Sequence, residues 1–84
     1  MKKASFQKDS TYIDILNEMA HQYIKIHIDS TYELANTAHT LSNEMDYGSG
    51  ISNSLLHMGI YYSEKGKSRE ALKNYCLALE RAEK

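Results

Sequence analysis

Hydrophobic residues recur along this chain at steps of three and four positions, which is the spacing of one face of an α-helix. The first such stretch covers roughly residues 10–27 and can begin at Asp9 or Ser10, because both residue types serve as helix N-caps. The segment IKIHID, residues 24–29, alternates like a β-strand, but the sequence offers it no partner strand. We therefore interpret it as the fraying end of the first helix. The predicted buried face of this helix consists of Tyr12, Leu16, Met19, Tyr23 and Ile26.

Three further helices follow, separated by short turns. Asp29 or Ser30 can cap the second helix, and glycines with small polar residues mark turns at residues 46–50 and 64–68. The predicted buried faces are Thr31, Leu34, Ala38, Leu41 and Met45 in the second helix; Ile51, Leu55, Met58 and Tyr62 in the third; and Ala71, Leu72, Tyr75, Ala78, Leu79 and Ala82 in the fourth. The sequence therefore predicts an all-α domain of four helices, with Leu77 on the opposite, exposed side of the last one.

The two halves of the chain repeat each other. Four residues of the first helix return 39 positions later in the third, and two residues of the second helix have counterparts 40 positions later in the fourth. These residues are Leu16, Met19, Ala20 and Tyr23, matched by Leu55, Met58, Gly59 and Tyr62, and Ala35 and Ala38, matched by Tyr75 and Ala78. Glycine inside a helix costs about 0.5–1 kcal/mol relative to alanine. Gly59 is therefore predicted to mark a close contact with another helix, where the leading helices of the two halves meet.

With these residues the chain resembles the tetratricopeptide repeat family. The family pattern W-x2-L-G-x2-Y followed by A-x3-F appears as Leu55-x2-Met58-Gly59-x2-Tyr62 and then Ala71-x3-Tyr75. The match covers residues 52–84 well, whereas the first copy, about 13–45, is more degenerate. The repeat spacing exceeds the family's usual 34 residues and looks like the extended repeats of bacterial signalling proteins. The resemblance implies two stacked antiparallel helical hairpins.

The resemblance also implies a binding surface. In this family the first helix of each hairpin lines a concave groove, which can hold an extended or helical peptide with apolar anchors at Leu56 and Ile60. The chaperone-tail variant of the groove needs basic residues where this chain has His21 and His57, so chaperone tails are not the expected ligand. Leu56 and Ile60 could equally pack against an adjoining helix or a second copy of the chain. The expected groove residues are Asn17, His21, Lys25, Asn53, Leu56, His57, Ile60 and Glu64.

Charge and composition narrow the possible partners. Ten basic and eleven acidic residues are scattered through 84 positions and give a formal net charge of −1, which argues against nucleic acid and against anionic membranes. No apolar run is long enough to span a bilayer or to form a signal peptide, and residues 1–9 are expected to be flexible. The single cysteine, Cys76, excludes an intramolecular disulfide and favours a reducing compartment, the cytoplasm.

No pattern of residues indicates catalysis or a cofactor. The four histidines include no i, i+4 pair, and neither His-Glu-x-x-His nor Cys-x-x-Cys occurs, so no metal site is predicted. Cys76 falls beside the predicted apolar face and is expected to be a small core residue and not a nucleophile.

Three functions remain open. The leading one is a non-catalytic protein or peptide interaction module that forms part of a longer array, because repeat arrays need about three units for a sufficient core. The second is a structural unit that self-associates, as a dimer or by helix exchange, through the exposed face of the last helix. The third is the sensory or regulatory segment of a bacterial signalling protein.

Overall fold

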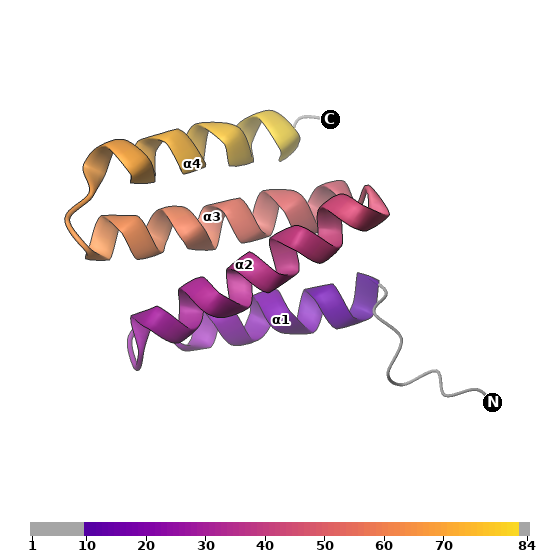
Figure 1. Cartoon of the computed structure of the whole chain (residues 1–84), viewed down its shortest axis with the longest axis horizontal. Helices are drawn as coiled ribbons and strands as arrows, with labels where there is room; N and C mark the ends of the chain where they lie inside the picture. Colours follow the sequence, from indigo (N-terminus) through magenta and orange to yellow (C-terminus); the bar gives the residue numbers. More distant parts are fainter. Residues whose placement is uncertain (1–9, 83–84) are drawn as a thin grey trace.

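The computed structural model describes residues 10–82, so the N-terminal segment that we expect to be flexible lies outside the described residues. The chain forms four helices: α1 (Ser10–Gln22), α2 (Ile28–Met45), α3 (Gly48–Glu64) and α4 (Ser68–Ala82). Residues 10–82 contain no strand, which confirms the all-α prediction. Each of the two halves is a helical hairpin, as Figure 1 shows.

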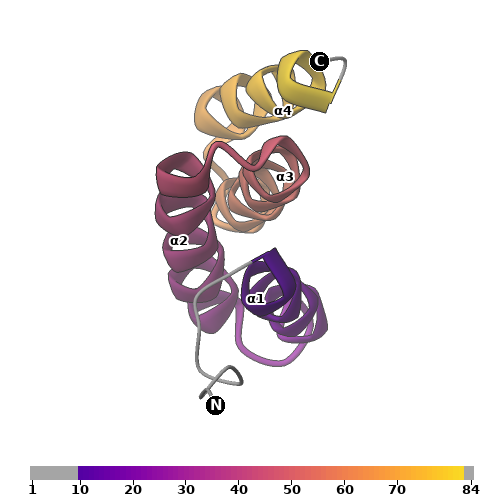
Figure 2. The same cartoon turned by 90° about the vertical axis from the view of Figure 1, so that its right-hand side faces the viewer.

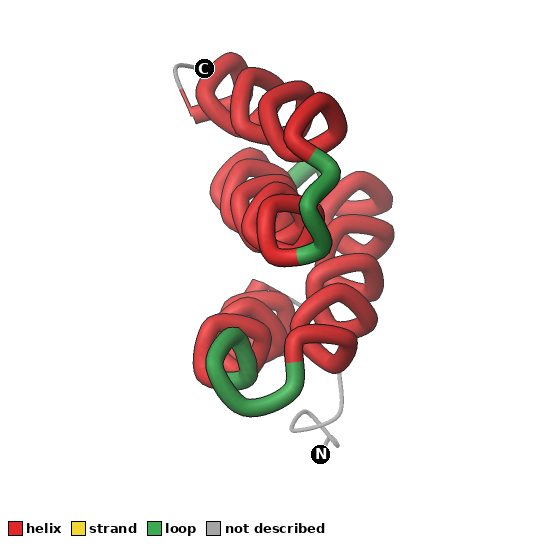
Figure 3. Tube along the Cα trace, turned by 90° about the vertical axis from the view of Figure 1, so that its left-hand side faces the viewer, coloured by secondary structure: helices red, strands yellow, loops and turns green. Residues whose placement is uncertain are grey.

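The two hairpins stack on each other. α2 packs against both α1 and α3, α3 packs against α4, and α1 and α3 also touch. Viewed from the ends in Figures 2 and 3, the leading helices α1 and α3 lie on one side of the stack and α2 lies on the other. Of the helices in residues 10–82, none is both long enough and apolar enough to cross a bilayer.

The first helix is shorter than predicted. It ends at Gln22, and residues 23–26 form a turn in which the His27 amide donates to the Tyr23 carbonyl at 2.7 Å. The interpretation of residues 24–29 as the end of this helix was therefore wrong. The buried residues of α1 are Ile13, Leu16, Asn17 and Ala20, so Leu16 is buried as predicted, whereas Met19, Tyr23 and Ile26 are exposed.

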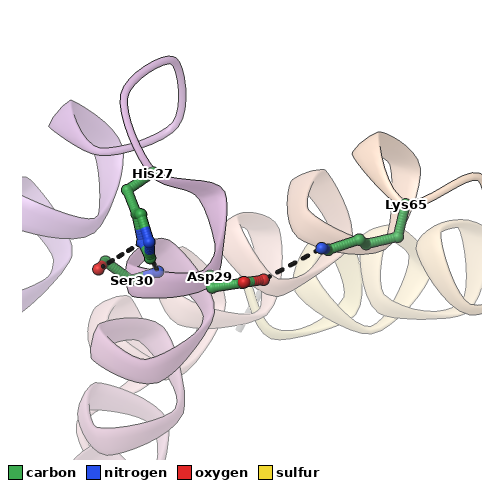
Figure 4. Close-up of polar contacts among 4 residues, drawn as sticks. All are labelled: His27, Asp29, Ser30 and Lys65. Carbon is green, nitrogen blue, oxygen red and sulfur yellow. Dashed lines mark hydrogen bonds and ion pairs between the residues drawn. The ribbon is translucent and has the colours of Figure 1, made fainter.

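His27, and neither Asp29 nor Ser30, caps α2. Its backbone is extended, and its Nδ1 accepts a hydrogen bond of 3.3 Å from the Ser30 amide, with the Ser30 hydroxyl 2.9 Å away (Figure 4). Asp29 lies in the first turn of α2, where its negative charge interacts favourably with the helix dipole. Its Oδ1 is 3.1 Å from Nζ of Lys65, the residue that follows α3, so this ion pair joins the two hairpins at one end.

Tyrosines join α2 to α3 near the same end. The ring centroids of Tyr32 and Tyr61 are 4.6 Å apart, and Tyr62 lies against both rings. A hydrogen bond with Tyr32, followed by burial, raises the pKa of Tyr62. The three rings, together with the Asp29–Lys65 pair, fix the crossing of α2 over α3.

Small residues form the helix contacts inside each hairpin. In the first, the Thr31 hydroxyl donates to the Ala20 carbonyl at 2.8 Å, and Ile13, Leu16 and Ala38 form the core. In the second, a Cβ on Gly59 would lie 2.6 Å from Cε1 of Tyr75 and 3.3 Å from the Ala71 carbonyl oxygen. Gly59 is therefore a close contact, as predicted, but its neighbour is α4 and not the leading helix α1.

The predicted buried faces of α2 and α4 included too many large residues. In α4 only Ala71 and Ala78 are buried, and Leu72 and Leu79 are each 64% exposed. Cys76 is also exposed, so its assignment to the core margin was wrong. Leu77 is 40% exposed, as expected, and the side chain of Ala82 lies outside the described part of the chain. In α2 the buried residues are Thr31, Ala35, Ala38 and Ser42, and Met45 is exposed.

Candidate functional site

A cleft of about 490 Å³ opens between α1 and α3, and the loop between α2 and α3 closes one side of it. The lining residues recur every three or four positions, so each helix presents one face to the cleft. They are Asp14, Asn17, Glu18 and His21 from α1, Tyr47 from the loop, and Ser49, Asn53 and His57 from α3. Every one of them carries a polar group. The volume of the cleft lies in the range of ligand pockets, about 300–1,000 Å³, but most ligand pockets are lined by apolar side chains. This cleft is suited to a ligand that forms hydrogen bonds.

Two buried polar side chains form the floor of the cleft. Asn17 is 4% exposed and His57 is 7% exposed, and Oδ1 of Asn17 lies 3.2 Å from Nδ1 of His57. Burial, followed by the charge of His21, lowers the pKa of His57, while a hydrogen bond to the Asn53 backbone acts in the opposite direction. Because Oδ1 of Asn17 is an acceptor, the neutral tautomer that fits this contact carries its proton on Nδ1, which donates to Asn17. In that tautomer Nε2 is an acceptor.

Asn17 also has an unused donor. Its Nδ2 is buried and makes no hydrogen bond, although the side chain lines the cleft. A buried donor without a partner costs about 1–3 kcal/mol. The floor therefore contains one N–H group of Asn17 that has no hydrogen-bond partner, next to the ring of His57.

The rim of the cleft is acidic. Asp14 and Glu18 lie one helical turn apart, both are exposed, and no Lys or Arg is among the lining residues. The Tyr47 hydroxyl donates to both carboxylate oxygens of Asp14, at 2.9 and 3.2 Å, and this hydrogen bond raises the pKa of Tyr47. Tyr47 thereby ties the loop before α3 to α1 and holds one carboxylate in place.

The structure brings together half of the groove residues expected from the sequence. Asn17, His21, Asn53 and His57 line the cleft, and the rings of His21 and His57 meet edge to face with centroids 5.9 Å apart. The other four do not line it. Lys25 is in the turn after the shortened α1, and Leu56, Ile60 and Glu64 lie elsewhere on α3, with Leu56 43% exposed and Ile60 half-buried.

Four lining residues were not foreseen. Asp14 lies three positions before Asn17 and Glu18 lies three positions before His21, so the helical spacing of these expected groove residues could have found both. Tyr47 and Ser49 belong to the turn and to the first turn of α3, and nothing in the sequence pattern indicates that this segment folds back over α1.

A second depression lies on the other side of α1 and is more apolar. It has a volume of about 330 Å³ and is lined by Met19, Tyr23, Ser30, Glu33, Leu34 and Thr37. In residues 10–82, no three His, Cys, Asp or Glu side chains lie close enough together to hold a metal ion. Comparisons with protein-family models, with curated proteins and with solved structures found no match to this chain.

Proposed function

We propose that this chain is a non-catalytic module that binds a peptide segment of another protein in the cleft between α1 and α3. The observation that carries the proposal is the cleft floor, where buried Asn17 has an N–H group without a hydrogen-bond partner beside the ring of His57. A peptide group has a complementary C=O and N–H, and peptide recognition commonly uses such main-chain hydrogen bonds.

We further propose that the two hairpins are tetratricopeptide-like repeats from a longer array, which is the setting in which a bacterial signalling protein could use them for regulation. The contact of Thr31 with Ala20 in the first hairpin has its counterpart in the contact of Ala71 with Gly59 in the second, which supports a common repeat. The exposed free thiol of Cys76 supports a reducing compartment such as the cytoplasm.

Catalysis is the less favoured use of the cleft. Carboxylates and histidines can transfer protons. However, Asp14 and Glu18 are exposed on the rim, and His57 is already hydrogen-bonded to an amide at the floor and not to a nucleophile. These groups therefore fit recognition better than acid–base chemistry.

Selection from a phage-displayed library of random peptides tests the proposed function. We expect selected peptides to shift the backbone amide signals of α1 and α3 in two-dimensional NMR spectra of the whole chain. Asn53 is an exposed residue of the cleft, so Asn53→Trp should block binding. The matched variant Asn36→Trp, on an exposed position of α2, should bind normally. Failure to select any peptide, or equal binding by both variants, would refute the proposal.

Self-association is the second candidate, and the exposed leucines of α4 favour it. Leu72 and Leu79 are seven positions apart and lie on one side of the helix. If this surface joins copies of the chain, light scattering will show a mass that rises with concentration, and Leu72→Lys with Leu79→Lys will restore the monomer. A monomer at every concentration would count against self-association.

A further inference from the structure

The cleft combines an acidic rim with a buried floor that contains an N–H donor without a hydrogen-bond partner, Nδ2 of Asn17. Asp14 and Glu18 place two carboxylates on one face of α1, and the lining residues of the cleft include no Lys or Arg beside them. Exposed acidic residues alone are ordinary on a protein surface. Here the same cleft also contains Nδ2 of Asn17, on a side chain that is only 4% exposed and makes no hydrogen bond from this nitrogen. The carboxylates of the rim favour a cation, and the unpaired N–H of the floor favours a hydrogen-bond acceptor. Two independent features therefore indicate one ligand that carries both groups.

We propose that the cleft selects peptide segments that carry a lysine or arginine side chain, with the cation at Asp14 and Glu18 and a main-chain carbonyl at Nδ2 of Asn17. This inference rests on the proposed function, because it names the class of peptide that the cleft takes. The Tyr47 hydroxyl holds Asp14 from one side at 2.9 Å, so this carboxylate is positioned before the ligand arrives. Guanidinium and ammonium groups form charge-assisted hydrogen bonds with carboxylates, which gives both affinity and selection against acidic segments.

The floor supplies the second half of the recognition. Nε2 of His57 is the acceptor left over when Nδ1 donates to Asn17, so the floor can accept a peptide N–H as well as donate to a peptide carbonyl. A cation without an amide group would satisfy the rim and leave the Asn17 donor unpaired. The cleft is thus matched to a cationic peptide rather than to a free polyamine.

The experiment uses the peptides selected by the wild-type chain and consists of three measurements. First, the selected sequences should be enriched in Lys and Arg, and replacing those residues by Gln should weaken binding. Second, the double variant Asp14→Asn with Glu18→Gln should lose roughly tenfold in affinity, the size expected when charge-assisted contacts become neutral ones. The matched double variant Glu33→Gln with Glu44→Gln removes the same charge from exposed positions of α2 and should keep wild-type affinity.

Third, the side-chain NH₂ signals of Asn17 report directly on the floor. They should move downfield when a selected peptide binds, because Nδ2 then acquires an acceptor. Spermidine, a cation without a peptide group, should shift signals near Asp14 and Glu18 but leave the Asn17 side-chain signals in place. This comparison separates a cationic peptide from a cation of any other source.

The outcomes distinguish this inference from the function on which it rests. If the library gives cleft-binding peptides that are neutral or acidic, or if both double variants bind equally, the chain still binds peptides but the charge preference is wrong. If peptides bind while the Asn17 signals stay fixed, the assignment of the floor is wrong. If spermidine displaces the peptides and moves the Asn17 signals equally, the site is one for polyamines. If no peptide is selected at all, both proposals fail.

Discussion

Replacing Gly59 by alanine tests whether close packing between α3 and α4 holds the second hairpin together. The new Cβ would lie 2.6 and 2.7 Å from two ring carbons of Tyr75, distances that no relaxed structure tolerates, and 3.3 Å from the Ala71 carbonyl oxygen. The Tyr75 ring must therefore move. Because Tyr75 is half-buried against α3, this movement opens the contact between the two helices.

Two opposing effects set the size of the change. Alanine is a better helix former than glycine, which stabilises α3 by up to about 1 kcal/mol. Overpacking a close contact costs about 1–3 kcal/mol. The second effect should win, so we expect Gly59→Ala to lower the free energy of unfolding by roughly 1–2 kcal/mol.

Urea unfolding followed by far-ultraviolet circular dichroism measures this change, and two further variants make the result specific. Gly48 also lies in α3, but nothing comes within 4 Å of its added Cβ, so Gly48→Ala should be neutral or slightly stabilising. In a Tyr75→Ala background the ring is gone, and Gly59→Ala should lose most of its penalty. The packing argument is wrong if Gly59→Ala leaves the chain as stable as the wild type, or if it does equal harm with and without the Tyr75 ring.

The remaining predictions concern buried polar groups and a helix cap, and the same unfolding assay measures each. Burial lowers the pKa of His57 below the ordinary value of 6.5, so the unfolded chain binds the proton more tightly. Stability should therefore fall as the pH drops below about 6.5, and His57→Gln should reduce this dependence without abolishing it, because burial also lowers the pKa of His39; a parallel pH profile in the variant would refute the assignment. Ser42 is fully buried and its hydroxyl makes no hydrogen bond, so Ser42→Ala should be neutral or stabilise by up to about 1 kcal/mol, and a clear loss would reveal a missed partner. His27→Ala removes the cap of α2 and should cost about 1 kcal/mol, whereas His27→Asp, which restores a capping acceptor, should not; equal effects would argue against the cap.

The sequence period was enough to predict four helices and two hairpins, and the predicted buried face of α3 is confirmed by buried Ile51 and Leu55. In α1 and α4 the period placed some exposed large residues on the buried face. The helical period predicts large apolar residues in the core wherever they recur every three or four positions. In the structure the closest helix contacts use small residues such as Thr31, Ala38 and Ala71, and larger ones such as Leu72 lie on the flanks. Helices approach each other most closely where side chains are small. A prediction that uses hydrophobicity alone therefore places the buried face of a helix a fraction of a turn away from its true position.

The helix ends explain the remaining differences. A histidine at position 27 is not among the usual capping residues, so the start of α2 was placed at Asp29 or Ser30 and α1 was extended too far. Because the first helix was expected to reach residue 27, Lys25 was also expected to line the groove. Asn17 and His57 could be placed on facing helices from the repeat alone. The hydrogen bond from the loop residue Tyr47 to Asp14 depends on a tertiary fold that no local pattern encodes.

The buried polar contact between Asn17 of α1 and His57 of α3 contributes little to the stability of the free chain. A buried hydrogen bond between neutral groups contributes only about 1 kcal/mol, and the unpaired Nδ2 of Asn17 offsets a gain of that size. Two apolar side chains of similar volume at positions 17 and 57 would hold the hairpins together without leaving a buried donor unpaired. Chains of this length have little stability to spare, so a costly arrangement where the leading helices α1 and α3 meet needs another reason. Breaks in local folding rules are expected at functional sites. Pairing with an incoming peptide group would satisfy this donor, so the same feature that weakens the free chain would stabilise the bound one.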